Sequence, residues 1–177
     1  MTGSIAAAPP ASRAAHMDFT PAYLEIEATY LVPAGSPLRA IADVDREGVR
    51  VAVNAGSGYD LHLSRSLQRA RLVRAPTIDA ALDLFVAGGL EAYAGLKPRL
   101  LADAEKLPGS RLLEGRYMAA QQTIATPRGR DTGADYLRAF IEDVKASGLL
   151  ARIVEKNGAR GLSIAPRARQ QHTEIHQ

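Results

Sequence analysis

The sequence predicts an α/β fold, because short β-branched runs alternate with helical patterns through the middle of the chain. Residues 49–53 form such a run and end in a glycine-rich turn. Leu63 and Leu67 then recur at the spacing of a helix, which we expect over about 59–70. Further strands are expected at 72–75 and 90–94. Because strand, helix and strand in short steps are typical of βαβ units, we expect a parallel sheet here.

Turn and cap residues mark the ends of the other elements. Thr77 is an N-cap for a helix that Gly88 and Gly89 end. A short helix is expected over 97–104, and helical periodicity predicts a longer one over 131–147. The remaining expected elements are strands at 24–32, 111–113 and 121–126 and a last helix at 149–156.

Composition excludes several classes of site. The 177 residues include no cysteine, which excludes a disulfide framework and a thiolate zinc site. A net charge of +3 and an aromatic content of 5% do not favour a nucleic-acid surface. His172 and His176 lie in a polar tail, where solvation is favoured over metal binding. We therefore expect no nucleic acid, no metal ion and no cofactor.

Both ends of the chain are rich in small or polar residues. Residues 1–16 lack a basic start followed by an apolar run of about 7–15 residues, so the chain as read carries no signal peptide. No apolar run elsewhere approaches the ~20 residues of a membrane span. We expect a disordered leader over 1–16 and a flexible tail over 167–177.

The local feature that most suggests ligand binding is the loop formed by Gly56, Ser57, Gly58 and Tyr59. It falls at an expected strand-to-helix junction, where glycines let a ligand approach the backbone and free N–H groups favour an anion. The Ser57 hydroxyl can add a hydrogen bond. The alternative is a plain glycine turn in which Ser57 or Asp60 caps the helix, and the residues alone favour neither reading.

No set of catalytic residues emerges. The loop is not a phosphate-binding P-loop, because no Gly-Lys-Ser/Thr follows it. Ser64 and Ser66 lack the glycine context of a nucleophile elbow, and the acids of 43–47 are not paired for acid–base work. We therefore expect a binding protein and not an enzyme.

Five segments in order along the chain resemble motifs of the family 3 extracellular solute-binding proteins, the amino-acid-type receptors of bacterial ABC importers. Residues 18–23 (DFTPAY) resemble the family's Phe-Ser-x-Pro-Tyr segment, and 51–59 (VAVNAGSGY) resemble its strand and ligand loop. Residues 41–44 (IADV) resemble the turn before its second lobe. Residues 83–92 (DLFVAGGLEA) resemble a helix-to-strand turn, and 136–153 (YLRAFIEDVKASGLLARI) resemble the terminal helices.

The resemblance implies an α/β, type II periplasmic-binding-protein-like fold, in which two lobes joined by crossing strands close on a solute. On this basis residues 45–116 form one complete α/β lobe, lobe two. Residues 17–44 and 117–166 supply the hinge strands and the C-terminal helices of a truncated first lobe. The implied ligand residues are Gly56, Ser57, Gly58 and Tyr59, with Tyr23 as a further contact.

The implied function is the substrate-binding component of an ABC importer, which holds a small amino-acid-like or carboxylate solute in an interlobe cleft. Its partners are that solute and an ABC transporter permease, and its location is the periplasm. Two departures bear on the ligand. The family's opening β-α-β-α-β segment has no counterpart here, and Leu96 stands where the family has an ammonium-binding aspartate. Because leucine cannot pair with an ammonium group, an ordinary α-amino acid is not favoured.

A contrasting hypothesis is a fragment that binds no solute and persists as a homodimer. Loss of strands from the first lobe would leave strand edges and apolar surface uncovered, and such surfaces favour self-association.

Overall fold

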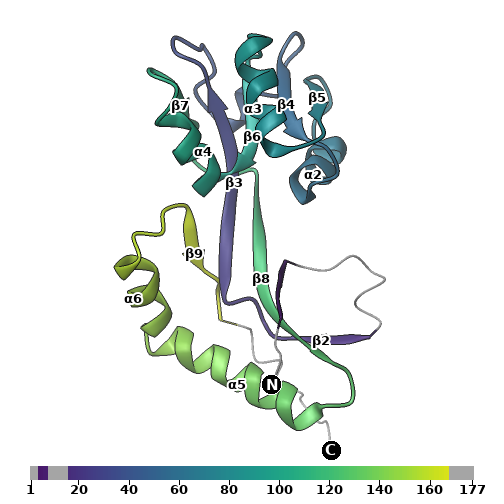
Figure 1. The fold of residues 1–177 in the computed structure, drawn as a ribbon, viewed down its shortest axis with the longest axis vertical. Coiled ribbons are helices and arrows are strands. Elements are labelled where there is room, and N and C mark those ends of the chain that lie inside the picture. The colour runs from purple at the N-terminus through teal and green to yellow at the C-terminus, as the bar shows by residue number, and fades with distance from the viewer. Residues whose placement is uncertain (1–3, 8–15, 168–177) are drawn as a thin grey trace, which may run out of the picture. The chain divides into compact units, whose positions relative to one another are not determined.

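The computed structural model describes residues 4–7 and 16–167, and the chain divides into two compact units (Figure 1). The first unit comprises the described residues within Met1–Glu25, Gln121–Ala159 and Ser163–Gln177. The second comprises Ile26–Ala120 and Arg160–Leu162. Residues 26–44, which the sequence assigned to the first lobe with the hinge, therefore group with the second unit, whereas the division into two functional lobes stays a prediction.

The sheet of the second unit is mixed. Strand β4 (Arg50–Asn54) pairs in parallel with β5 (Arg71–Ala75) on one side and with β6 (Ala92–Leu96) on the other. Strand β3 (Leu24–Val32), which enters this unit at Ile26, runs antiparallel to β6 and also pairs with the short β7 (Arg111–Leu112). The parallel sheet expected from the strands at 49–53, 72–75 and 90–94 is thus confirmed, and β3 and β7 add antiparallel pairs to it.

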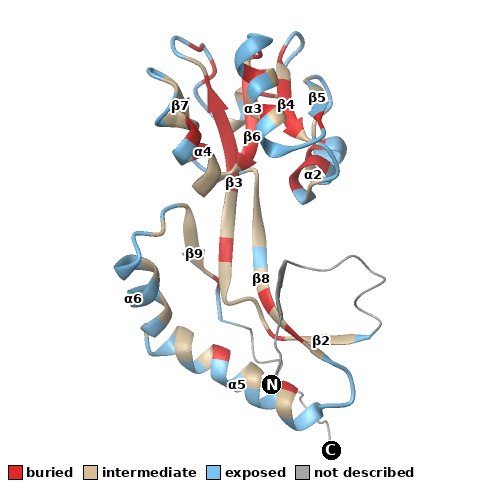
Figure 2. Cartoon of the chain, in the orientation of Figure 1, coloured by how far each residue is buried: buried red, intermediate tan, exposed pale blue. Residues whose placement is uncertain are grey.

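Two apolar layers cover the faces of this sheet, because successive side chains of a strand point to opposite faces. Val51 and Val53 of β4 pack in one cluster, with helix α2 (Gly58–Ser66) above them. Ala52 packs in the other cluster, beneath α3 (Ile78–Ala87) and α4 (Lys97–Ala104). Figure 2 shows the buried residues gathered on β3, β4 and β6 of this unit, as expected for a sheet covered on both faces.

The first unit contains fewer buried groups. Strands β1 (Ser4–Ala7) and β2 (Met17–Phe19) both pair antiparallel with β8 (Met118–Pro127). Helices α5 (Asp131–Ala146) and α6 (Leu149–Lys156) follow, joined at Gly148, whose φ of 69° suits glycine. The short β9 (Leu162–Ile164) pairs with β3, and a 3-10 turn, η1 (Ile41–Asp43), belongs to the second unit.

Several expected boundaries are corrected by the structure. The prediction of a disordered leader is wrong for residues 4–7, which form β1. Residues 1–3 and 8–15 of that leader, and residues 168–177 of the predicted tail, lie outside the described residues. The helix expected over 59–70 ends at Ser66, because the Asp45 carboxylate accepts hydrogen bonds from the N–H groups of residues 68–70. The strand expected at 90–94 begins at Ala92, because the Leu90 N–H bonds Phe85 O at the end of α3. Within the described part of the chain, no helix combines the length and apolarity that spanning a bilayer requires.

Candidate functional site

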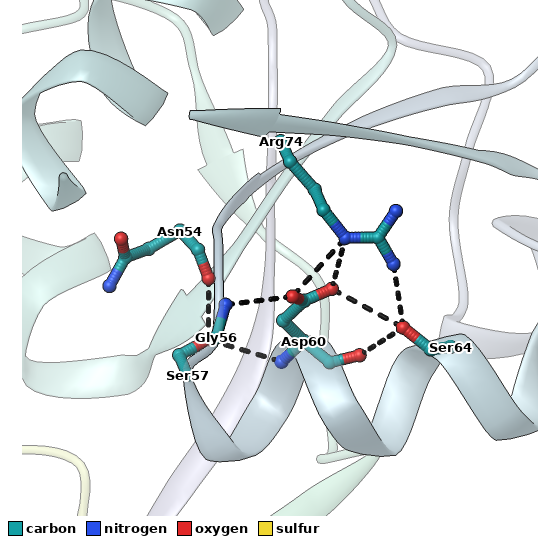
Figure 3. A network of polar contacts seen from close by, with 6 residues as sticks. All are labelled: Asn54, Gly56, Ser57, Asp60, Ser64 and Arg74. Carbon is teal, nitrogen blue, oxygen red and sulfur yellow. Dashed lines mark hydrogen bonds and ion pairs between the residues drawn. The ribbon is translucent and has the colours of Figure 1, made fainter. Parts of the chain in front are cut away.

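The predicted ligand loop lies between β4 and α2, where Ser57 caps the helix (Figure 3). Its Oγ accepts a hydrogen bond from the Asp60 N–H at 3.1 Å and donates one to Asn54 O at 2.7 Å. Gly56 has a φ of 73°, in the left-handed region that only glycine adopts readily. Ser57 Oγ thus caps α2 by accepting the Asp60 N–H, which is the alternative role that the sequence left open. Its hydroxyl proton is used in the bond to Asn54 O, also within the loop.

Asp60 holds the loop from the first turn of α2. Its carboxylate is buried and accepts a hydrogen bond from the Gly56 N–H at 2.9 Å. The same carboxylate forms an ion pair with Arg74 Nε at 2.9 Å. Ser64 Oγ donates to Asp60 O at 2.7 Å and accepts from Arg74 Nη2 at the same distance, as the dashed lines in Figure 3 trace. The loop is therefore rigidly supported by its own helix and by β5.

Two backbone donors of the loop remain open. Among the described residues, the N–H groups of Gly58 and Tyr59 have no hydrogen-bond partner, whereas those of Gly56, Ser57 and Asp60 do. A Cβ atom placed on Gly58 would meet no atom within 4 Å, so the backbone is approachable there. The positive end of the helix dipole adds to these donors, and the arrangement suits a carboxylate or another small anion.

The end of β6 lies beside this loop in the sheet. Ala52 pairs with Tyr93 in parallel register, so the carboxyl ends of β4 and β6 open at one edge. Leu96 occupies the N-cap position of α4 and supplies no side-chain cap. Lys97, the next residue, pairs through Nζ with Glu27 Oε2 at 2.9 Å. In the first turn of α4, Arg99 pairs with Asp79 of α3 and with Asp103 of its own helix, both at 2.6 Å. These carboxylates are therefore already paired with a base, as Glu27 and Asp60 are.

Two buried polar atoms near the loop were not singled out from the sequence. Asn54 Oδ1 and the Tyr117 hydroxyl are buried and lack a hydrogen-bond partner among the described residues. The Tyr117 ring contacts Tyr30, with centroids 4.6 Å apart, and His62 of α2. Burial raises the pKa of the Tyr117 hydroxyl well above its usual range, so it stays a neutral donor. Asn54 directly precedes the glycine turn and could have been noticed, whereas no local signal marks Tyr117.

Tyr59 and Tyr23 differ in what they offer. The Tyr59 side chain is buried in the apolar cluster below α2, and this burial raises the pKa of its hydroxyl. Its contribution to a ligand is thus its backbone N–H. Tyr23 lies in the first unit, where its N–H donates to Gln122 O at 3.0 Å and its carbonyl accepts from the Ala165 N–H at 3.1 Å. The structure brings Gly56, Ser57, Gly58 and Tyr59 together in one loop of the second unit, and Tyr23 as a ligand contact stays a prediction.

In the described parts of the chain, no three His, Asp or Glu side chains lie close enough together to hold a metal ion.

Comparison with known proteins identifies the fold. No protein-family model matches the chain. No curated protein matches it either. Among solved structures, an ancestral cationic amino acid solute-binding protein matches with a TM-score of 0.65 and 18% identity, over 84% of this chain and 65% of that one. A solute receptor for L-cysteine from Neisseria gonorrhoeae matches with a TM-score of 0.65 and 20% identity, over 90% and 68%.

A third match is an amino acid ABC transporter substrate-binding protein from Streptococcus pneumoniae bound to L-arginine, with a TM-score of 0.61 and 18% identity, over 84% and 63%. The chain thus spans about 65% of the length of the first of these relatives. At such low identity the likeness establishes architecture and leaves the ligand open. The expected α/β, periplasmic-binding-protein-like fold is confirmed, and the chain shares it with amino-acid solute-binding proteins.

Proposed function

We propose that the chain is the solute-binding component of a bacterial ABC importer and holds the carboxylate of a small solute at the N-terminus of α2. The fold shared with amino-acid solute-binding proteins supports this assignment. The proposal includes a periplasmic location and a permease partner, since both belong to that class of importer. It also makes the chain a binding protein and not an enzyme.

The observation that carries the proposal is the pair of open N–H donors on Gly58 and Tyr59. A carboxylate placed there gains two backbone hydrogen bonds and the helix dipole without displacing any contact of Ser57 or Asp60. A solute with a carboxylate and a neutral or weakly polar remainder fits best, because Leu96 brings no charge to the adjacent strand end.

Calorimetry against a panel of amino acids, keto acids and dicarboxylic acids tests the proposal. We expect at least one carboxylate to bind, and Gly58→Ala to weaken it at least about tenfold, because the new methyl group occupies the approach to the two N–H groups. Recovery of the bound solute unchanged after incubation would support binding without catalysis.

Gly133→Ala is the matched control. Gly133 lies in α5, and a Cβ there also meets no atom within 4 Å, so the same substitution leaves the loop untouched. If no carboxylate binds, or if both variants weaken binding equally, the loop is not the site.

A further inference from the structure

Helices α5 and α6 of the first unit carry most of the exposed large apolar side chains in the described chain. Four of the seven belong to these two helices: Tyr136 at 63% exposed, Phe140 at 45%, Leu149 at 41% and Ile153 at 46%. Figure 2 shows α6 with no buried segment, in agreement with the absence of any buried residue in it. Apolar groups gathered in this way mark an interaction surface more often than scattered ones do.

These residues form two stripes of identical spacing. Tyr136, Phe140 and Asp143 stand at i, i+4 and i+7 on α5, so they share one face of the helix. The rings of Tyr136 and Phe140 stack with centroids 6.3 Å apart, which keeps them on that face. The face is opposite the one that buries Ala134 and Ile141.

Leu149, Ile153 and Lys156 stand at the same three positions on α6. Each stripe therefore presents two apolar side chains followed by a charge, and the charge is negative on α5 and positive on α6. The helices as wholes share this bias: α5 holds four acids and two bases, and α6 holds two bases and one acid. An interface that brings the α5 stripe of one copy against the α6 stripe of another would therefore pair an acid with a base.

We propose that the α5 and α6 stripes form a homodimer interface, in which α5 of one copy packs against α6 of the other. A two-fold axis generates both contacts at once, because such an interface uses the same patch on each copy. With the paired helices running in the same direction, the aromatic pair meets Leu149 and Ile153 of the second copy. Asp143 then meets Lys156 of the second copy.

The structure favours a second copy over an unrelated partner because both charged groups are available within the chain. Asp143 and Lys156 are exposed, and neither side chain has a recorded partner among the described residues. The interface involves helices, and it is thus independent of both the strand edges and the ligand loop. Because one helical hairpin offers a small footprint, we expect a reversible dimer with a dissociation constant in the micromolar range.

Sedimentation equilibrium of the full chain over a range of concentrations tests the interface by charge exchange. Asp143→Lys alone and Lys156→Asp alone should each weaken the dimer about tenfold. The double variant, which exchanges the two charges, should restore the wild-type dissociation constant to within about threefold. Circular dichroism of each variant establishes that α5 and α6 remain helical.

Glu155→Lys is the matched control, since it reverses an exposed charge on α6 about 200° around the helix from Ile153. It should leave the dimer intact. A chain that stays monomeric at every concentration overturns the proposal and indicates that the two stripes bind a different protein. A dimer that is insensitive to both single reversals, or one that the double variant fails to restore, overturns it as well.

Discussion

The two units of the molecule are stabilised in different ways. In the second unit both faces of the sheet are covered, and large side chains such as Tyr30, Tyr93, Leu63 and Leu100 are almost completely buried. In the first unit the buried apolar residues among those described are three alanines and one isoleucine: Ala125, Ala134, Ala165 and Ile141. Burial of large apolar groups therefore stabilises the second unit far more than the first.

Polar contacts contribute a larger share of the stabilising interactions in the first unit than in the second. The side chain of Lys145 is only 2% exposed, and its Nζ donates to Ala22 O and Pro166 O, both at 3.0 Å, and pairs with Glu142 at 2.6 Å. One buried ammonium group thus joins three segments that are distant in the sequence. The difference teaches that a unit with a thin apolar core depends on a few directional contacts, which single substitutions can remove.

The largest expected effect contrasts the two cores directly. Leu100→Ala should lower the free energy of unfolding by about 2–5 kcal/mol, because it leaves a cavity in a core that packs on all sides. Ile141→Ala should fall at the low end, about 2 kcal/mol, because its surroundings in the first unit are less crowded. Urea titration followed by circular dichroism measures both. Equal losses would remove the contrast between the two cores.

Lys145→Met should destabilise the first unit by about 1–3 kcal/mol, because the carbonyl groups of Ala22 and Pro166 lose their donor. Hydrogen exchange should show faster exchange in β2, β8 and α5 and unchanged protection in β4 and β6. Lys156→Met, at an exposed lysine of α6, is the control and should change stability by less than about 0.5 kcal/mol in dilute protein. Faster exchange across the second unit as well would show that the two units unfold together.

A smaller effect separates two glycines of the candidate loop. Gly56→Ala should cost about 1–2 kcal/mol, because Gly56 has a φ of 73° although space for a Cβ is open. Gly58→Ala should leave stability almost unchanged, since Gly58 has no positive φ and its Cβ position is also open. Thermal melting of the two variants distinguishes strain in the loop from loss of ligand contact.

The smallest expected effect is a local loss of stability at low pH. Hydrogen bonds from the backbone N–H groups of Ala70, Arg69 and Gln68 hold the pKa of Asp45 below its usual range. A carboxyl whose folded pKa is depressed contributes stability above its unfolded pKa of about 4, and this is lost as pH falls through the folded pKa. The amides of residues 68–70 should therefore exchange faster at pH 3 than at pH 5 after correction for intrinsic rates. Asp45→Asn should abolish that pH dependence.

Much of the local structure could be predicted from short-range patterns. Strand 24–32 and helices 97–104 and 149–156 have the expected bounds, and Thr77 caps α3 by accepting from the Ala80 N–H at 3.1 Å. The candidate loop was found for the same reason, because a glycine run after a β-branched strand is a local signal. The ion pair between Asp60 and Arg74 that supports the loop could not be predicted in this way, since Arg74 reaches the loop from a different strand.

The sequence by itself determined most of the longer helices and strands, the cap of α3 and the position of the glycine loop, because backbone preferences and apolar spacing act over a few residues. It did not predict the short strands β1, β2 and β9, which form by pairing with distant strands. Tertiary structure decided that β3 and β7 run antiparallel, that Asp45 ends α2 early and that Lys145 is buried against Ala22 and Pro166. It also decided that Ser57 turns its hydroxyl inward and leaves Gly58 and Tyr59 as the open donors. These outcomes depend on which distant groups meet when the apolar faces are buried, and no local pattern carries that information.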